Sequence, residues 1–242
     1  IYGWALLQDH ARAESVALFT AAVDAPTRRR LIDRLLASPE PVPEPFRLES
    51  PFVTNFDRAT YAGAFARVQR YIRDGDCYQV NLAQRLSALA RGDPWSAYLQ
   101  LRARMASPYS AFLSRDSASV LSFSPERFLH LAGGRVETRP IKGTRRRGAT
   151  PTADREQARQ LLASEKDRAE NVMIVDLMRN DLGKSCRTGS VRVEKLCALE
   201  SYANVHHLVS VVSGEPDPAR GPARLLADCF PGGSITGAPK IR

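Results

Sequence analysis

The sequence has no long apolar run, no closely spaced cysteines and no internal repeat. Its apolar runs are far shorter than the roughly 18 residues of a membrane-spanning helix, so we expect a protein without membrane contact. Cys77, Cys186, Cys197 and Cys229 are far apart and lack the CxxC or Cys/His spacing of a zinc site. We therefore expect four reduced thiols in a cytoplasmic protein rather than a disulfide framework.

A surplus of acidic residues is also absent. The chain has 35 Lys and Arg against 26 Asp and Glu, a formal net charge of +9. This excess of basic residues indicates an anionic partner, either nucleic acid or a small polyanionic substrate. The basic residues are scattered among acidic ones, and no basic face interleaved with aromatic residues stands out. The charge alone leaves both kinds of partner open.

The chain of 242 residues is long enough for one large domain or two small ones. Prolines at positions 39, 41, 43 and 45 predict an extended linker between a segment over residues 1–45 and a core over residues 46–242. The segment 238–242 is typical of the first turn of a helix. We therefore expect that the sequence is a piece of a longer protein.

The spacing of apolar residues predicts the elements of both segments. Helices are expected over residues 25–37, 57–74, 93–106, 151–164, 165–179 and 223–229. Strands are expected over residues 1–7, 15–20, 77–88, 109–113, 118–123, 191–196 and 204–212. Because helices and antiparallel-looking strands are mixed without βαβ alternation, the predicted class is α+β.

A β-hairpin is predicted within residues 124–148. Its strands cover residues 128–131 and 135–141, and its turn is residues 132–134. Glu126 precedes the first strand and Lys142 ends the second. Adjacent strands lie about 4.8 Å apart, so these two side chains can be neighbours. A lysine beside Gly143 suits a nucleophile or base, although a solvated hairpin with a surface lysine is the simpler reading.

Three other stretches carry candidate site residues. Asp167 and Glu170 are three residues apart and share a helix face, either as half of a Mg²⁺ site or as a complement to the helix dipole. His207 follows His206 on a strand and faces the opposite way, as a catalyst or as a hydrogen-bonded core histidine. Gln79 lies on the polar face of the strand over residues 77–88, which would line a polar site or face solvent.

The last stretch is the glycine-rich loop over residues 231–240. Its glycines permit close backbone approach to an anion, but the spacing matches neither a Walker A loop nor a dinucleotide fingerprint. Taken with the other stretches, this loop completes a set of ordered motifs. They read SPERF (124–128), TRPIKGT (138–144), AENVMIVDLMRNDLG (169–183), HHLVS (206–210) and PGGSITGAPK (231–240). This set resembles the chorismate-utilising enzymes.

Two positions indicate the branch of that family. Lys142 stands where anthranilate synthases carry Ala, and Gln79 stands where isochorismate and salicylate synthases carry a water-activating Lys. Both differences favour the aminodeoxychorismate synthases, whose reaction lies on the route to 4-aminobenzoate and folate. That resemblance implies a single folding unit of two antiparallel sheets packed face to face, with helices outside and the site in a cleft between them. Residues 1–45 would then be a partial N-terminal segment of this unit rather than a separate domain.

The resemblance also implies a reaction. Lys142 would attack C2 of chorismate while Glu126 protonates the leaving C4 hydroxyl, and ammonia from a glutamine amidotransferase subunit would then add at C4. Attack requires the neutral amine, which like charge from Arg139 and from residues 145–147 would favour. Glu170, with Asp167 nearby, would bind Mg²⁺. Substrate-binding positions would be Gln79, Gly143, Thr144, His207, Gly233 and Ser234.

Three alternatives remain at this point. The protein could form anthranilate and pyruvate from chorismate. It could be a fragment without activity, because the family's remaining metal-binding glutamates and its carboxylate-binding Arg and Tyr lie beyond residue 242. It could also be a basic binding module that performs no catalysis, although we expect no nucleic acid partner.

Overall fold

A computed structural model of the chain describes residues 2–37, 44–105 and 107–240. The chain divides into two compact units, Ile1–Glu44 and Pro45–Arg242. Three of the four prolines of the predicted linker, at positions 39, 41 and 43, lie outside the described residues. That residues 1–45 belong to the same folding unit as the core stays a prediction.

The first unit is a strand pair followed by a helix. Strand β1 (Trp4–Asp9) pairs antiparallel with β2 (Glu14–Phe19), and helix α1 spans Ala25–Leu36. The carboxylate of Asp24 caps this helix by accepting from the Thr27 amide at 2.8 Å. All three elements agree with the predicted ranges to within a few residues.

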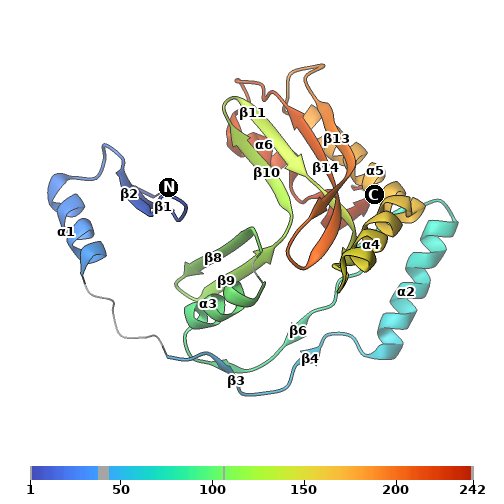
Figure 1. The fold of residues 1–242 in the computed structure, drawn as a ribbon, viewed down its shortest axis with the longest axis horizontal. Coiled ribbons are helices and arrows are strands. Elements are labelled where there is room, and N and C mark those ends of the chain that lie inside the picture. Colours follow the sequence, from blue (N-terminus) through green and yellow to red (C-terminus); the bar gives the residue numbers. More distant parts are fainter. Residues whose placement is uncertain (1, 38–43, 106, 241–242) are drawn as a thin grey trace. The chain divides into compact units, whose positions relative to one another are not determined.

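A five-stranded antiparallel sheet is the centre of the second unit (Figure 1). Its order is β10 (Arg127–Ala132), β11 (Arg135–Arg139), β14 (Val205–Gly214) and β12 (Ile141–Arg146), and β13 (Arg192–Ser201) also pairs with β14. The predicted hairpin is confirmed as β10 and β11. However, Pro140 ends β11, and the chain continues as β12 along a different part of β14.

Helices pack against this sheet. Helix α4 spans Pro151–Ala163, α5 spans Glu165–Gly183 and α6 spans Gly221–Cys229, and α5 lies against β14 and β12. Helix α5 is four residues longer than predicted, since its buried positions continue to Asp181 and Leu182. The core between helices and sheet is made of Val136, Val175, Leu182, Cys186, Val212, Leu225 and Cys229.

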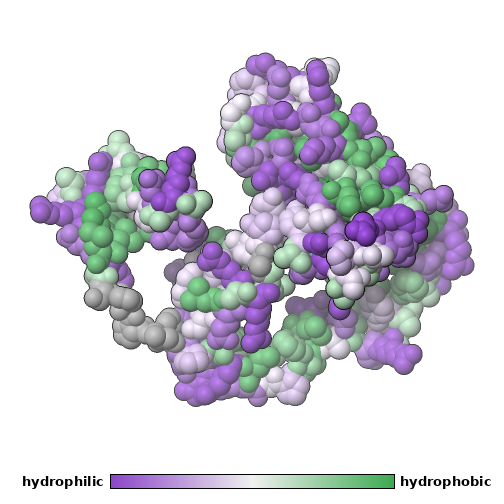
Figure 2. All heavy atoms as spheres, in the orientation of Figure 1, coloured by the Kyte–Doolittle hydropathy of each residue, from purple (hydrophilic) through white to green (hydrophobic). Residues whose placement is uncertain are grey.

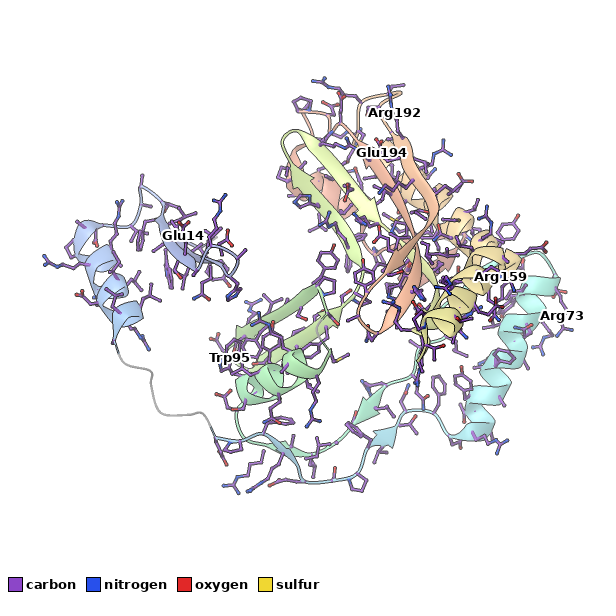
Figure 3. The ribbon with its side chains drawn as sticks, in the orientation of Figure 1. Glu14, Arg73, Trp95, Arg159, Arg192 and Glu194 are labelled. Carbon is purple, nitrogen blue, oxygen red and sulfur yellow. The ribbon has the colours of Figure 1, made fainter. Side chains whose placement is uncertain are left out.

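The remaining elements are helices and short strand pairs. Helix α2 spans Arg58–Arg73 and begins after its predicted cap, Asp57, while α3 spans Pro94–Met105. Trp95 of α3 stacks on Tyr98 and meets Phe112 of β8 edge to face (Figure 3). The strand pairs are β3 (Arg47–Leu48) with β7 (Ala90–Arg91), β4 (Val53–Thr54) with β6 (Leu86–Ser87), β5 (Gln79–Val80) with β15 (Gly237–Ala238), and β8 (Tyr109–Arg115) with β9 (Ala118–Ser124).

The α+β class with antiparallel sheets is confirmed, but one detail of the prediction is wrong. The strand expected over residues 77–88 is broken into β5 and β6, because these pair with different partners. The pairs β3–β7, β4–β6, β5–β15 and β8–β9 are further antiparallel sheets of two strands each. Phe52, Val53 and Leu89 of this region are 60–70% exposed, and Figure 2 shows hydrophobic patches there.

Two further expectations concern cysteines and membrane spans. The four cysteines are free thiols, and Cys186, Cys197 and Cys229 are buried. Among the residues that the structure describes, no helix combines the length and apolar character needed to cross a membrane.

The packing of α5 on the sheet makes a prediction about stability. Leu182 is 0% exposed within the core, whereas Leu162 of α4 is 41% exposed. Leu182→Ala should lower the free energy of unfolding by about 2–5 kcal/mol through the cavity that it leaves. Leu162→Ala, the same substitution on a helix surface, should cost less than about 1 kcal/mol. Urea denaturation measures both, and equal losses would contradict the assigned core.

Candidate active site

Glu126 lies between β9 and β10 and is held by two hydrogen bonds. Its Oε1 accepts from the Ile141 amide and from Ser234 Oγ, each at 3.2 Å. The carboxylate lines a pocket of about 280 Å³ whose walls are mainly apolar and include Phe128 and Met178. Burial raises the pKa of Glu126, while these hydrogen bonds and the charge of Lys142 partly oppose that rise.

Lys142 is half-buried on β12, directly after the Ile141 amide that binds Glu126. The two ends of the hairpin are therefore adjacent, as the sequence predicts. The predicted source of like charge around Lys142 is weaker than expected, because three of the arginines invoked are neutralised by carboxylates. These pairs are Arg139 with Glu200, Arg145 with Asp167 at 3.1 Å, and Arg147 with Asp154 at 2.7 Å.

Thr144 and His207 form a second polar group on the same sheet. They are partners in the register of β12 and β14, and Thr144 Oγ1 lies 2.8 Å from His207 Nδ1. Burial lowers the pKa of His207, and a hydrogen bond with the backbone of Gly143 partly opposes this. The ring also meets Tyr202 edge to face at 5.6 Å. This environment favours the neutral imidazole, which can both donate and accept a hydrogen bond.

His206 faces the opposite way, as predicted for neighbours on a strand. Its Nδ1 lies 2.7 Å from Ser201 Oγ, and its Nε2 lies 3.0 Å from Asp154 Oδ1. The side chain is 3% exposed. His206 is therefore the hydrogen-bonded core histidine of the pair.

Gly143 brings β12 against the first turn of α5. Its φ is +82°, and a Cβ at this position would lie 2.9 Å from Cβ of Asp167 and 2.9 Å from Cδ1 of Leu161. A larger residue would push the strand and helix apart. This contact places Thr144 of β12 next to the N-terminal turn of α5, which carries Asp167.

The two carboxylates on α5 differ in their surroundings. Asp167 is largely buried, and its Oδ2 accepts from Arg145 at 3.1 Å. Glu170 is 38% exposed, and its nearest cation is Lys166 at 3.9 Å. Within the described ranges, no group of three or more His, Cys, Asp or Glu is placed to hold a metal ion. Glu170 alone thus fits as one carboxylate ligand of a cation such as Mg²⁺, which takes one or two carboxylates with substrate and water.

The glycine-rich loop connects Glu126 with the strand that carries Gln79. Helix α7 (Gly233–Thr236) and β15 form this loop, and β15 pairs with β5. Gly237 has φ +119°, and a Cβ there would lie 2.3 Å from the Gln79 carbonyl oxygen. The side-chain Oε1 of Gln79 is buried and accepts no hydrogen bond from the described residues. A buried amide oxygen without a donor is a place where a ligand donor would be stabilising.

Most of the predicted site residues therefore form two neighbouring groups joined by β12. Glu126, Lys142, Ser234, Gly233 and Gln79 belong to the first group, through the hairpin and the loop. Thr144, His207, Gly143 and Asp167 belong to the second. Glu170 lies one turn beyond Asp167, and the structure records no hydrogen bond from it to either group.

Sequence reasoning missed several residues that hold these groups in place. Arg145 was read as a like charge but binds Asp167, and Tyr202 contacts His207 without any local motif. Lys240 was read only as part of a motif, yet its ammonium is buried on Asp181. No local pattern in the sequence identifies these partners.

The chain matches known proteins along its whole length. The family described as "chorismate binding enzyme" matches residues 1–242. The chain is 50% identical over 242 residues to "Aminodeoxychorismate synthase component 1" of Klebsiella aerogenes, covering 100% of this chain and 52% of that protein. It is 46% identical over 194 residues to "Anthranilate synthase component 1 1" of Haloarcula marismortui, covering 80% of this chain and 40% of that protein.

A solved structure shares the fold. The crystal structure of anthranilate synthase component I from Streptococcus pneumoniae TIGR4 superposes with a TM-score of 0.81 at 29% identity. The match covers 99% of this chain and 55% of that one. The chain spans about half the length of the aminodeoxychorismate synthase component 1 proteins of three bacteria that it matches over its whole length.

The burial of Glu126 makes a prediction about pH. Because its pKa is raised above the ordinary value of 4.5, the folded protein holds this proton more tightly than the unfolded chain does. The wild-type protein therefore loses stability as the pH rises from about 4.5 through the raised pKa. Glu126→Gln lacks this loss, so its unfolding midpoint in urea should rise relative to that of the wild type as the pH increases from about 4.5. A difference between the two midpoints that stays constant above that pH would contradict the burial.

Proposed function

Since this chain belongs to the family of chorismate-binding enzymes, we propose that the protein transfers an amino group from ammonia to C4 of chorismate. The product is 4-amino-4-deoxychorismate, the precursor of 4-aminobenzoate in folate synthesis. The observation that carries this proposal is that Glu126 accepts from the Ile141 amide, which places its carboxyl group beside Lys142, the next residue of β12. An acid beside an amine suits the replacement of a hydroxyl by an amine.

The proposed reaction has two displacements. In the first, neutral Lys142 Nζ forms a bond to C2 of chorismate, both double bonds of the ring diene shift, and the C4–O bond breaks. Hydroxide is a poor leaving group, so Glu126 gives it a proton and water departs. In the second, ammonia forms a bond to C4, both double bonds shift back, and the C2–Nζ bond breaks. Glu126, now ionised, accepts the proton released by the added ammonia.

The raised pKa of Glu126 supports its role as the acid. A carboxyl group that keeps its proton nearer to neutral pH is a better donor to a leaving oxygen than an exposed one. Its hydrogen bonds to the Ile141 amide and Ser234 restrict its orientation. The net positive charge of the chain favours the approach of chorismate, which carries two carboxylates.

The remaining predicted residues would bind the substrate and a cation. We propose that His207, Thr144 and Gln79 hydrogen-bond chorismate, and that the backbone at Gly143, Gly233 and Ser234 lies against it. Glu170 would be the ligand that this chain contributes to Mg²⁺, which would hold the ring carboxylate of the substrate. Asp167 would act beside it by fixing Arg145, since that pair is already formed.

We also propose that the ammonia comes from a glutamine amidotransferase subunit. The relative from Klebsiella aerogenes is named as a component 1, which indicates a second component. A cytoplasmic location stays a prediction from the sequence.

A second candidate function is the formation of anthranilate. The relative from Haloarcula marismortui, named an anthranilate synthase, is 46% identical over 80% of this chain, so overall similarity does not decide between the two. Lys142, which stands where the resemblance places Ala in that branch, favours amination at C4. The product formed from chorismate and ammonia distinguishes the two functions: 4-amino-4-deoxychorismate supports our proposal, and anthranilate with pyruvate contradicts it.

The covalent step predicts a trapped adduct. The complete natural protein, incubated with chorismate and Mg²⁺ but no ammonia, should show by mass spectrometry an adduct on Lys142 equal to chorismate less water. Lys142→Ala should show no adduct and should lose at least about 100-fold in turnover with ammonia, as removal of a nucleophile does. Lys195→Ala, at an exposed lysine of β13, is the control and should keep both. An unmodified Lys142 together with full turnover in Lys142→Ala would rule out the nucleophile.

The proposed cation ligand makes a separate prediction. Glu170→Gln should raise the Mg²⁺ concentration for half-maximal turnover by on the order of tenfold or more, because an amide replaces an anionic ligand. Asp176→Asn, at an exposed carboxylate of the same helix, should leave this concentration unchanged. Turnover of the complete natural protein, measured at several Mg²⁺ concentrations, provides the check. Unaltered Mg²⁺ dependence in Glu170→Gln would remove Glu170 from the site.

A further inference from the structure

Lys240 is a buried cation that the proposed reaction does not use. It ends the glycine-rich loop, and its side chain is 10% exposed. Its Nζ donates to Asp181 Oδ2 at 2.7 Å and to the Cys229 carbonyl oxygen at 2.8 Å. Lysine is almost never buried unless it is paired, so this contact is a specific feature of the fold.

Asp181 is the partner on α5, and it is almost fully enclosed at 1% exposure. Its other oxygen, Oδ1, accepts from Lys184 at 2.7 Å. Lys184 belongs to the end of the same helix and is 38% exposed, so it does not touch the loop through this bond. Two ammonium groups therefore share one carboxylate, but only Lys240 links it to another part of the chain.

The contacts of Lys240 close the loop at both ends. Cys229 ends α6, immediately before the loop, and Lys240 is the last described residue after it. One ammonium group thus ties the entrance and the exit of the loop to the same point on α5. We refer to these contacts among Lys240, Asp181 and the Cys229 carbonyl as the loop staple.

The stapled loop carries the contacts that reach the candidate site. Ser234 Oγ donates to Glu126, and Asn81 Nδ2 donates to the Ser234 carbonyl oxygen at 3.4 Å. Near the other end, Ala238 pairs with Gln79, and the Ala238 carbonyl accepts from the Tyr78 amide at 2.8 Å. The position of the loop therefore sets both the partner of the acid and the strand of Gln79.

We propose that Lys240 is a positioning residue, whose staple to Asp181 and Cys229 holds the glycine-rich loop so that Ser234 orients Glu126. Lys240 does not contact the substrate in this proposal, because its ammonium already binds an enclosed carboxylate. The effect on catalysis rests on the proposed function. The effect on the loop does not.

Amide hydrogen exchange tests the staple without reference to activity. In Lys240→Met, exchange of the Tyr78 and Thr236 amides, which bond to the Ala238 and Gly232 carbonyls, should accelerate by at least about tenfold. Lys184→Met removes the other ammonium from the same carboxylate and should leave these amides protected. Lys240→Arg, which keeps the charge and donors, should restore most of the protection. Equal exchange in Lys240→Met and Lys184→Met overturns the proposal.

Kinetics of the complete natural protein test positioning against a general loss of structure. Lys240→Met should lower kcat by about tenfold or more with little change in KM, as loss of acid orientation does. The hydrogen bond from Ser234 lowers the pKa of Glu126, so its loss should move the descending limb of the pH profile to higher pH. Ser234→Ala should produce the same shift. A fall in kcat without any shift of the limb overturns the positioning role.

A double variant and the wild-type product separate failure of the staple from misfolding and from failure of the proposed function. If Lys240→Met does not fold, Asp181→Asn combined with Lys240→Met removes the staple without leaving the buried Oδ2 of a charged carboxylate unpaired, and the same exchange and pH shifts are expected. Exchange that matches the wild type in this double variant overturns the staple. A wild-type protein that makes no 4-amino-4-deoxychorismate contradicts the proposed function alone, and the exchange comparison then decides the staple.

Discussion

The rest of the second unit depends on the pairing of β14. This strand binds β11 and β12 in succession along one edge and β13 along the other, so its backbone groups are satisfied by neighbours on both sides. All but the first of its residues are buried. Such a strand must be rich in β-branched residues and poor in charge, and VHHLVSVVSG satisfies both conditions. The two histidines are its only ionisable side chains, and each has hydrogen-bond partners.

The split of one edge of β14 between two strands creates the candidate site. β11 leaves the sheet at Pro140, which lacks an amide hydrogen for the ladder, and β12 resumes at Ile141. The Ile141 amide is available to Glu126 at this break, and Lys142 follows immediately. The same strand then passes α5 at Gly143, where no side chain keeps helix and strand apart. A single short strand thus contacts both polar groups of the candidate site.

Electrostatics around the site are more balanced than the composition suggests. The net charge is +9, but three of the arginines near β12 are matched by carboxylates from α4, α5 and β13. Pairs of this kind fix side chains more than they supply free charge, because each cation is offset by its partner. The pKa of Glu126, the proposed acid, is instead raised because apolar walls enclose its carboxyl group. Burial, rather than an excess of positive charge, is therefore the main physical influence on Glu126.

The sequence by itself determined the local structure and the identity of the candidate residues. The cap at Asp57, the hairpin turn at Gly133 and Gly134, and the apolar stripe of α5 are encoded within a few residues, because caps, turns and helix faces depend on short-range geometry. Ordered motifs carried the family and the roles proposed for Lys142 and Glu126. Only the tertiary structure decided which carboxylate each arginine binds, where the strand over residues 77–88 breaks, and that Lys240 reaches Asp181. Apart from Arg147 and Asp154, these partners lie 22 or more residues apart, and nothing in local spacing distinguishes one carboxylate from another until the fold encloses one of them.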